Sequence, residues 1–304
     1  MKKMGAEKRL RMAVAAALTL GVLSTGGGHV FAADTTDSAD EHALGETVVT
    51  ATRTPNKELK ADANITVITG RDIERRHYTD LTQALRDVPG VTVNQYAPAG
   101  YNNSTKFYIN GSEDVVLLID GVRQNYAGGF AASLTSALKD LSGIERIEVL
   151  EGATSRVLGT QAFSGAINIV TRQVGPTLYA RAAGGSYGTA QGEVRGLFRH
   201  QFTNGNLFTS SLSAGYQRSD GAVRNGDFKG GKAFWQGSLD AAQYKVDAQA
   251  GYTNTDFGAN TFYSIASTDQ WESTTRYLAS VKAETKGKIH IAPQISWLRN
   301  YDHF

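Results

Sequence analysis

The sequence predicts an α+β domain followed by antiparallel, membrane-spanning β-strands. Three observations lead to this prediction. Short strand and helix patterns separated by glycine-bearing turns fill 64–171, strict alternation of apolar and polar residues begins after Arg172, and the first 32 residues have the features of an export signal. The chain has 304 residues, of which 33 are glycine and none is cysteine. The lack of cysteine excludes a disulfide scaffold, a cysteine-based metal site and thiol catalysis.

Residues 1–32 are predicted to be a cleaved signal peptide. A basic segment precedes a mostly apolar stretch from Met12 to Leu23, which is shorter than the ~20 residues that cross a bilayer as a helix. Val30 and Ala32 are small residues suited to cleavage after Ala32. Cleavage would remove five of the 31 basic and one of the 29 acidic residues. The basic excess therefore belongs to the signal, and no nucleic-acid partner is expected.

Residues 33–55 are predicted to be a disordered tether that ends in a strand-forming segment. The tether is acidic, has no lysine or arginine before Thr47 and has few large apolar side chains, so it cannot form a core of its own. A β-branched run, Thr47-Val48-Val49-Thr50, follows and Pro55 ends it. This run can be an edge strand of the next domain, or a peptide that pairs with the sheet edge of another protein.

Residues 56–172 are predicted to form the α+β domain. Thr69 with Asp72 predicts the capped start of one short helix, and a second helix is expected to begin at Asp80 and to end at Pro89-Gly90. Two long irregular stretches are rich in Asn, Tyr, Gly and Ala: 94–105 and 122–133. The expected strands cover 65–68, 91–93, 106–110, 115–120, 144–150 and 166–171.

The rest of the chain, 173–304, is predicted to be the N-terminal part of an outer-membrane β-barrel. In 244–253, Ala248 and Ala250 would face lipid, whereas Gln249 and Gly251 would face the lumen. Tight joints alternate with long ones, which is typical of barrels whose short turns lie in the periplasm. A soluble β-sandwich is the alternative at this point. The seven expected strands cover 177–184, 189–201, 206–217, 232–240, 244–253, 275–284 and 288–299.

Five segments between 46 and 172 resemble, in order, the motifs of TonB-dependent outer-membrane receptors. Glu46-Thr47-Val48-Val49-Thr50-Ala51 resembles the TonB box. Asp87-Val88-Pro89-Gly90-Val91, Leu117-Leu118-Ile119-Asp120-Gly121-Val122 and the segment from Ile144 to Gly152 resemble successive motifs of the plug domain. The segment from Gly165 to Arg172 resembles the closing strand of the plug.

Three positions depart from the family pattern. Asn110 stands where the family has an arginine before glycine, and Ala153 and Leu158 replace a proline and a tyrosine. These departures concern the packing of the plug.

The resemblance implies a plug domain and about seven strands of a barrel in an outer membrane of Gram-negative type. Barrels of this family have about 22 strands, so the sequence is interpreted as a truncated form. The implied function is energised uptake of a scarce nutrient complex, either a ferric siderophore or cobalamin. TonB with its inner-membrane energising complex and the outer-membrane lipid are the implied partners, and no cofactor is implied. The alternatives are a plug fragment that binds without transport, and a passive channel or adhesin.

The resemblance also implies where ligands bind. TonB would pair with the TonB box in the periplasm. The substrate would contact the two long stretches of the plug that face outwards, where the candidate residues are Asn94, Gln95, Tyr96, Tyr101, Arg123, Gln124, Asn125 and Tyr126.

Catalysis and a metal site are not expected. None of the six histidines has a second histidine or a glutamate at metal-ligand spacing. Ser164 lacks the glycine two residues earlier that a nucleophile elbow needs. Glu145 and Glu148 point to opposite faces of a strand, so they are expected to form ion pairs with Arg146 or Arg172 rather than to act as a carboxylate pair.

Overall fold

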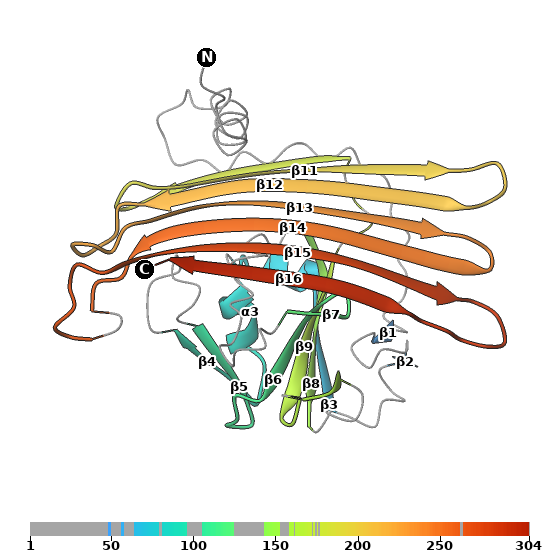
Figure 1. Ribbon diagram of the computed structural model, residues 1–304, viewed down its shortest axis with the longest axis horizontal. Helices are drawn as coiled ribbons and strands as arrows, with labels where there is room; N and C mark the ends of the chain where they lie inside the picture. Colours follow the sequence, from blue (N-terminus) through green and yellow to red (C-terminus); the bar gives the residue numbers. More distant parts are fainter. Residues whose placement is uncertain are drawn as a thin grey trace, which may run out of the picture.

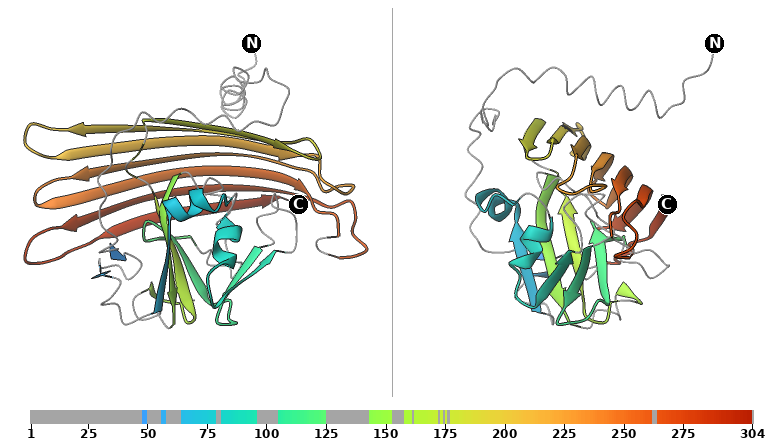
Figure 2. Two further views of the ribbon diagram at one scale, coloured as in Figure 1. Left: turned by 180° about the vertical axis from the view of Figure 1, so that it is seen from behind. Right: turned by 90° about the vertical axis from the view of Figure 1, so that its left-hand side faces the viewer.

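The computed structural model places an α+β domain against one face of a long, curved sheet (Figures 1 and 2). We call the first part the N-terminal domain (residues 64–171) and the second the wall sheet (residues 178–303). The predicted signal peptide and most of the predicted tether lie outside the residues that the structure describes. Those residues are 48–49, 56–57, 64–78, 81–95, 105–124, 143–152, 158–160, 162–171, 173, 175, 177–261 and 264–303.

The N-terminal domain is built on a five-stranded sheet whose strand order differs from the order along the chain. Its strand order is β3-β8-β9-β6-β7, with β6 parallel to β9 and the other pairs antiparallel. All five residues of β6 are buried, which explains its unbroken apolar run. The strands are β3 (Asn64–Thr69), β6 (Val115–Ile119), β7 (Val122–Arg123), β8 (Ile144–Glu151) and β9 (Gly165–Thr171).

Two short helices and a separate hairpin complete the N-terminal domain. Helix α2 (Gly70–Arg75) starts at the predicted capping box, and α3 (Leu81–Arg86) buries Leu81, Ala84 and Leu85 in the core. The hairpin pairs β4 (Val91–Gln95) with β5 (Thr105–Ile109). Neither helix, nor any other within the described ranges, is long and apolar enough to cross a membrane.

The wall sheet is a meander of seven antiparallel strands, each paired with the next along the chain. The joints 202–206, 241–243 and 286–293 lie at one end, which we call the tight-turn end. The joints 186–188, 220–227 and 259–270 lie at the other, the long-loop end. The strands are β10 (Leu178–Gly185), β11 (Thr189–Gln201), β12 (Leu207–Ser219), β13 (Phe228–Asp240), β14 (Tyr244–Gly258), β15 (Trp271–Thr285) and β16 (Gln294–His303).

The predicted position of the last strand was wrong. Residues 288–299 were expected to be a strand with Pro293 inside it, but β16 begins at Gln294. The joint before it is longer than the predicted Lys286-Gly287 turn. Its shape depends on the Thr285 hydroxyl, which donates to the Ile289 carbonyl at 2.7 Å and accepts from the Ile291 amide at 2.9 Å. Pro293 therefore removes no amide from the β16 ladder.

The two faces of the wall sheet differ in chemistry, and only the concave face meets the N-terminal domain (Figure 2). Gln249 and Thr253 of β14 point to the concave side and are buried, whereas Ala250 between them is exposed on the convex side. The convex face also exposes Leu212 and Trp297. Since the concave face packs on an α+β domain and not on a second antiparallel sheet, the β-sandwich alternative is excluded and the predicted fold class is confirmed.

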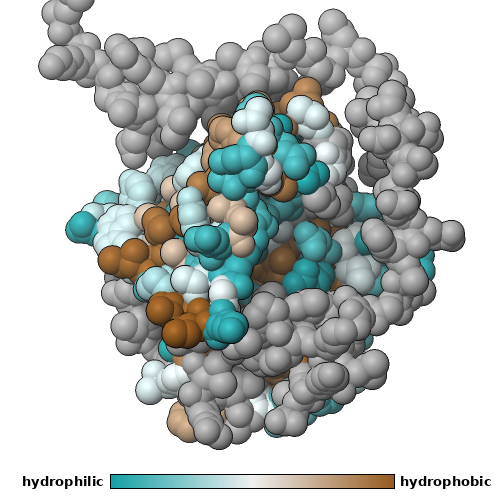
Figure 3. All heavy atoms as spheres, turned by 90° about the vertical axis from the view of Figure 1, so that its right-hand side faces the viewer, coloured by the Kyte–Doolittle hydropathy of each residue, from teal (hydrophilic) through white to brown (hydrophobic). Residues whose placement is uncertain are grey.

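Aromatic side chains lie towards both ends of the convex face. Near the long-loop end, the ring centroids of Tyr252 and Tyr277 are 5.3 Å apart and those of Tyr277 and Tyr301 are 6.2 Å apart. Near the tight-turn end, the rings of Phe198 and Phe208 are 6.4 Å apart. An apolar band between two aromatic girdles is the arrangement of a strand that spans a bilayer. Figure 3 shows the described residues from the tight-turn end, where hydrophobic side chains lie next to hydrophilic ones.

We expect the two faces to differ sharply in their tolerance of charge. Replacing Ala248 on the convex face by arginine should cost roughly 2–4 kcal/mol near mid-bilayer, whereas Ser213→Arg on the concave face should cost far less. Gln249 is a poor control for this test, because it is buried and donates to the Ile119 carbonyl of the N-terminal domain at 3.5 Å. The measurement is the free energy of unfolding in lipid vesicles. Equal costs for Ala248→Arg and Ser213→Arg would contradict the assignment of the faces.

Candidate functional site

The hairpin formed by β6 and β7 contacts the wall sheet through hydrogen bonds. Its apolar residues Ile119 and Val122 belong to the same buried cluster as Phe234 of β13 and Leu278 of β15. Two wall side chains reach backbone carbonyls of the hairpin. Gln249 donates to Ile119, and the Arg276 guanidinium donates to the carbonyl of Gln124. The segment 119–124 is thus fixed to β14 and β15.

A buried polar network supports this hairpin from inside the N-terminal domain. The backbone of Asp120 has a left-handed conformation with φ 49°, which allows the tight Asp120-Gly121 turn. The Gly121 amide donates to the Asn168 side chain at 3.1 Å, and the Asn168 amide group donates to Glu148 at 3.0 Å. Glu148 in turn pairs with Arg146 at 2.9 Å. Asn168 and Glu148 are fully buried, so the network replaces the hydrogen bonds that water would otherwise make.

The predicted role of the glutamates in β8 is confirmed. Arg146 pairs with both Glu145 and Glu148, each at 2.9 Å. Both carboxylates are thus bound to one guanidinium.

The Asp120 carboxyl group lies between the N-terminal domain and the wall sheet. It accepts hydrogen bonds from the Thr171 amide at 2.9 Å and from the Thr171 hydroxyl at 2.7 Å. Burial raises the pKa of Asp120 to about 6, and the nearby Asp247 carboxylate of β14 acts in the same direction. The hydrogen bonds from Thr171 and the charge of Lys245 oppose this rise in pKa.

The raised pKa predicts that the chain is more stable in mild acid. Because the folded state holds the Asp120 proton more tightly than the unfolded state, the free energy of unfolding should fall by roughly 2 kcal/mol as the pH rises from about 4 to about 7. Asp72 and Asp87 have pKa values below the ordinary value of 3.8. Their contributions to the pH dependence of the free energy of unfolding therefore fall below the range from pH 4 to pH 7. Chemical denaturation in detergent micelles, followed by circular dichroism, measures the change. The Asp120→Asn variant should lose most of this pH dependence, and an unchanged dependence in that variant would refute the assignment.

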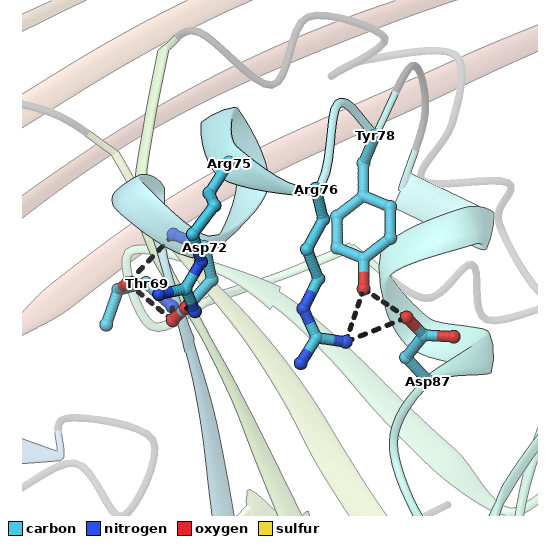
Figure 4. Close-up of polar contacts among 6 residues, drawn as sticks. All are labelled: Thr69, Asp72, Arg75, Arg76, Tyr78 and Asp87. Carbon is cyan, nitrogen blue, oxygen red and sulfur yellow. Dashed lines mark hydrogen bonds and ion pairs between the residues drawn. The ribbon is translucent and has the colours of Figure 1, made fainter.

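A second polar cluster joins the two helices of the N-terminal domain (Figure 4). The Arg76 guanidinium donates to the Asp87 carboxylate at 3.0 Å and to the Tyr78 hydroxyl at 3.1 Å, and the Tyr78 hydroxyl also donates to Asp87. The hydrogen bond from Tyr78, with that from Arg76, lowers the pKa of Asp87. These contacts join the end of α2 to the end of α3.

The structure describes four of the eight candidate substrate residues. Asn94 is half-buried near the end of β4 and pairs with Lys106, and Gln95 is the last residue of that strand. The Arg123 guanidinium donates to the carbonyls of Leu158 and Thr160. The other candidates, Tyr96, Tyr101, Asn125 and Tyr126, lie outside the described residues.

Gln124 has a position that its sequence context did not reveal. It is fully buried, and its side-chain amide donates to the Val122 carbonyl at 2.9 Å. Its backbone amide donates to the Leu117 carbonyl at 2.8 Å. In this structure Gln124 is therefore bonded within the β6–β7 hairpin through both its backbone and its side chain.

The long loops of the wall sheet are bonded to one another at their end of the sheet. The side chain of Asn225 donates to the carbonyls of Thr268 at 2.9 Å and Gln270 at 2.7 Å. In the opposite direction, the side chain of Asn260 donates a hydrogen bond to the Arg224 carbonyl at 2.9 Å. The joints 220–227 and 259–270 thus hold each other in one arrangement, a feature that sequence reasoning missed because asparagine is common in any loop.

At the opposite end, part of the predicted TonB box forms a short strand. β1 (Val48–Val49) pairs with β2 (Asn56–Lys57), and in Figure 1 both lie towards the tight-turn end of the wall sheet. The rest of the predicted box, Glu46, Thr47, Thr50 and Ala51, lies outside the described residues. A two-stranded pair leaves the second edge of β1 open within the described part of the chain.

Within the ranges that the structure covers, no group of three or more histidine or acidic side chains could hold a metal ion.

Comparisons with known proteins agree with this geometry. Residues 57–166 match the family described as "TonB-dependent Receptor Plug Domain". An iron-regulated outer membrane virulence protein of Vibrio cholerae is 35% identical over 167 residues, which are 53% of this chain and 24% of that relative. The vitamin B12 transporter BtuB of Vibrio vulnificus is 31% identical over 176 residues, which are 57% of this chain and 28% of that relative. The chain thus spans about a quarter of the length of these relatives.

Solved structures share the fold at lower sequence identity. A ferric enterobactin receptor from Pseudomonas aeruginosa superposes with a TM-score of 0.59 at 18% identity, over 84% of this chain and 42% of that receptor. The siderophore receptor PiuA from Acinetobacter baumannii superposes with a TM-score of 0.62 at 17% identity, over 84% of this chain and 39% of that receptor. Residues 57–166 thus match the plug domain of TonB-dependent receptors in sequence, and the plug and wall sheet together share the fold of these solved receptors.

Proposed function

We propose that this chain acts in the energised uptake of a scarce nutrient complex across an outer membrane, with a ferric siderophore or cobalamin as the substrate. One observation carries the proposal: the plug is fixed by buried contacts to the polar, concave face of a sheet whose other face is apolar and girdled by aromatic residues. A passive channel needs no domain across its lumen. The relatives named above, an iron-regulated protein and a vitamin B12 transporter, support the two substrate classes.

The proposed mechanism uses the two ends of the sheet differently. The substrate docks at the long-loop end, on the plug segments that begin at Asn94 and Arg123 and on the bonded loops around Asn225. In the proposal, Gln95, Tyr96, Tyr101, Asn125 and Tyr126 contribute to this contact, with Gln124 as the buried support of the second segment. TonB pairs with the TonB box around Val48 at the tight-turn end and pulls on the plug. No covalent step is part of this mechanism.

An uptake assay tests the proposal. Cells that lack their own receptors for siderophores and cobalamin would carry the natural gene that encodes this chain, in strains with and without TonB. We expect accumulation of labelled cobalamin or of iron from a ferric siderophore only where TonB is present. Binding without accumulation would favour the non-transporting plug fragment, and accumulation independent of TonB would favour a passive channel. Either result would refute the proposal.

A further inference from the structure

Arg299 of β16 is a charged side chain on the apolar, convex face of the wall sheet. In the antiparallel register it lies opposite Tyr277, which lies opposite Tyr252, so the three side chains share that face. Its neighbours along the same strand and face are Trp297 and Tyr301. Arg299 is exposed, and no ion pair among the described residues includes it. The described part of the chain thus offers this cation aromatic neighbours and no anion.

The other arginine and the lysine of the convex face are placed differently. Arg218 pairs with Asp220, and Lys229 lies opposite both Arg218 and Asp256 in the register. This row is at the long-loop end of the strands, and Arg299 lies nearer the middle of the sheet. An arginine on the lipid face of a barrel lowers stability or at best leaves it unchanged. Stability therefore does not explain why this position is arginine.

The guanidinium of Arg299 points towards the long-loop end. Its Cζ atom lies 4.5 Å from the centroid of the Tyr301 ring, and Tyr301 follows Arg299 on the same face in the direction of that end. An arginine at the margin of a bilayer extends its charge to the lipid head groups in this way. The cation–π contact also holds the planar guanidinium in place, so less side-chain freedom is lost when an anion binds.

We propose that Arg299, together with Tyr277 and Tyr301, binds a phosphate group of lipopolysaccharide in the outer leaflet of the membrane. The long loops of outer-membrane barrels lie on the extracellular side, so this end of the sheet meets the outer leaflet. The lipid A part of lipopolysaccharide carries phosphate groups directly above its acyl chains. The guanidinium donates a planar pair of hydrogen bonds to such a phosphate, and the exposed Trp297 ring packs against the acyl chains. The inference rests on the proposed location in an outer membrane, and not on the transport of any substrate.

Titration of the full chain in detergent micelles with lipid A tests the inference. The unmodified chain should bind lipid A about tenfold more tightly than dephosphorylated lipid A or phosphatidylglycerol, because a phosphate monoester offers more charge and more acceptor oxygens than either. Arg299→Met should weaken lipid A binding about fivefold and leave binding of the dephosphorylated lipid unchanged. Arg299→Lys keeps the charge without the planar pair of donors and should bind with intermediate affinity. Tyr301→Leu removes the ring beneath the guanidinium and should weaken lipid A binding about threefold.

The matched control is Arg218→Met, which removes an arginine from the same face near the same end. Because Arg218 already pairs with Asp220, this variant should keep the lipid A affinity of the unmodified chain. Circular dichroism would show that the variants keep their sheet, and Arg299→Met should melt at the same temperature or higher. If Arg299→Met does not fold, Arg299→Lys and Tyr301→Leu decide the outcome.

Three results would overturn the inference. Equal binding of lipid A and its dephosphorylated form would show that no phosphate is recognised. Equal losses in Arg299→Met and Arg218→Met would show a general attraction between a basic surface and an anionic lipid. Equal binding of phosphatidylglycerol would make a glycerophospholipid the partner. A chain that fails the uptake assay but passes these tests would refute the proposed function and leave the lipid site in place.

Discussion

Replacing Val49 by proline is expected to lower substrate uptake more than tenfold while substrate binding at the cell surface stays within about twofold. The reason is that strand addition works through backbone hydrogen bonds. Proline removes the amide of residue 49 and fixes its φ angle, so the segment can no longer pair along its length. Uptake and binding of the same labelled substrate, measured in cells that carry the natural gene, separate the two effects.

Two controls belong to this experiment. Val49→Thr keeps the amide and the β-branched side chain, so uptake should stay near normal. Ser38→Pro places the same residue in the predicted tether, outside the box, and should also be tolerated. In the structure Val49 pairs with Asn56, so Val49→Pro also disturbs the β1–β2 pair. Normal uptake in the Val49→Pro variant would show that the segment is not the TonB box.

Gly165→Ala is expected to cost the plug about 3 kcal/mol or more of stability. Gly165 is the first residue of β9 and pairs with Glu151 of β8. A Cβ atom there would lie 2.2 Å from the Leu150 carbonyl oxygen and 2.9 Å from the Ile109 side chain, so the backbone of β8 would have to move. Overpacking and backbone strain of this kind each cost about 1–3 kcal/mol.

Gly111→Ala provides the matched control in the same domain. Gly111 also has a positive φ, of 84°, but a Cβ atom there would meet no atom within 4 Å. Only the conformational cost of about 1 kcal/mol should remain. Urea unfolding of residues 47–175 would compare the variants, since this piece contains every strand and helix of the plug and is predicted to unfold cooperatively. Similar losses for the two substitutions would mean that the close approach at Gly165 is not real.

Much of the local structure could be predicted because its signals are local. The capping box of Thr69 and Asp72 is present, with the Asp72 amide donating to the Thr69 hydroxyl oxygen at 3.1 Å. The alternation in 244–253 placed the residues of β14 on the correct faces, since adjacent residues of a strand point to opposite sides. The joint before β16 was misread, because Lys286-Gly287 looks like a complete turn and the bonds of the Thr285 hydroxyl reach up to six residues along the chain.

The sequence by itself therefore determined the resemblance to TonB-dependent receptors, the order of the α+β domain and the wall strands, and which face of each strand is polar, because motifs and alternation are set by neighbouring residues. Only the tertiary structure decided which polar residues of the wall sheet form hydrogen bonds with the N-terminal domain. Gln249 and Ile119 are 130 residues apart along the chain, and Arg276 and Gln124 are 152 apart. Contacts over such separations depend on how a curved sheet and a five-stranded domain fit together, and the strand order β3-β8-β9-β6-β7 that sets this fit has no signal in the local sequence.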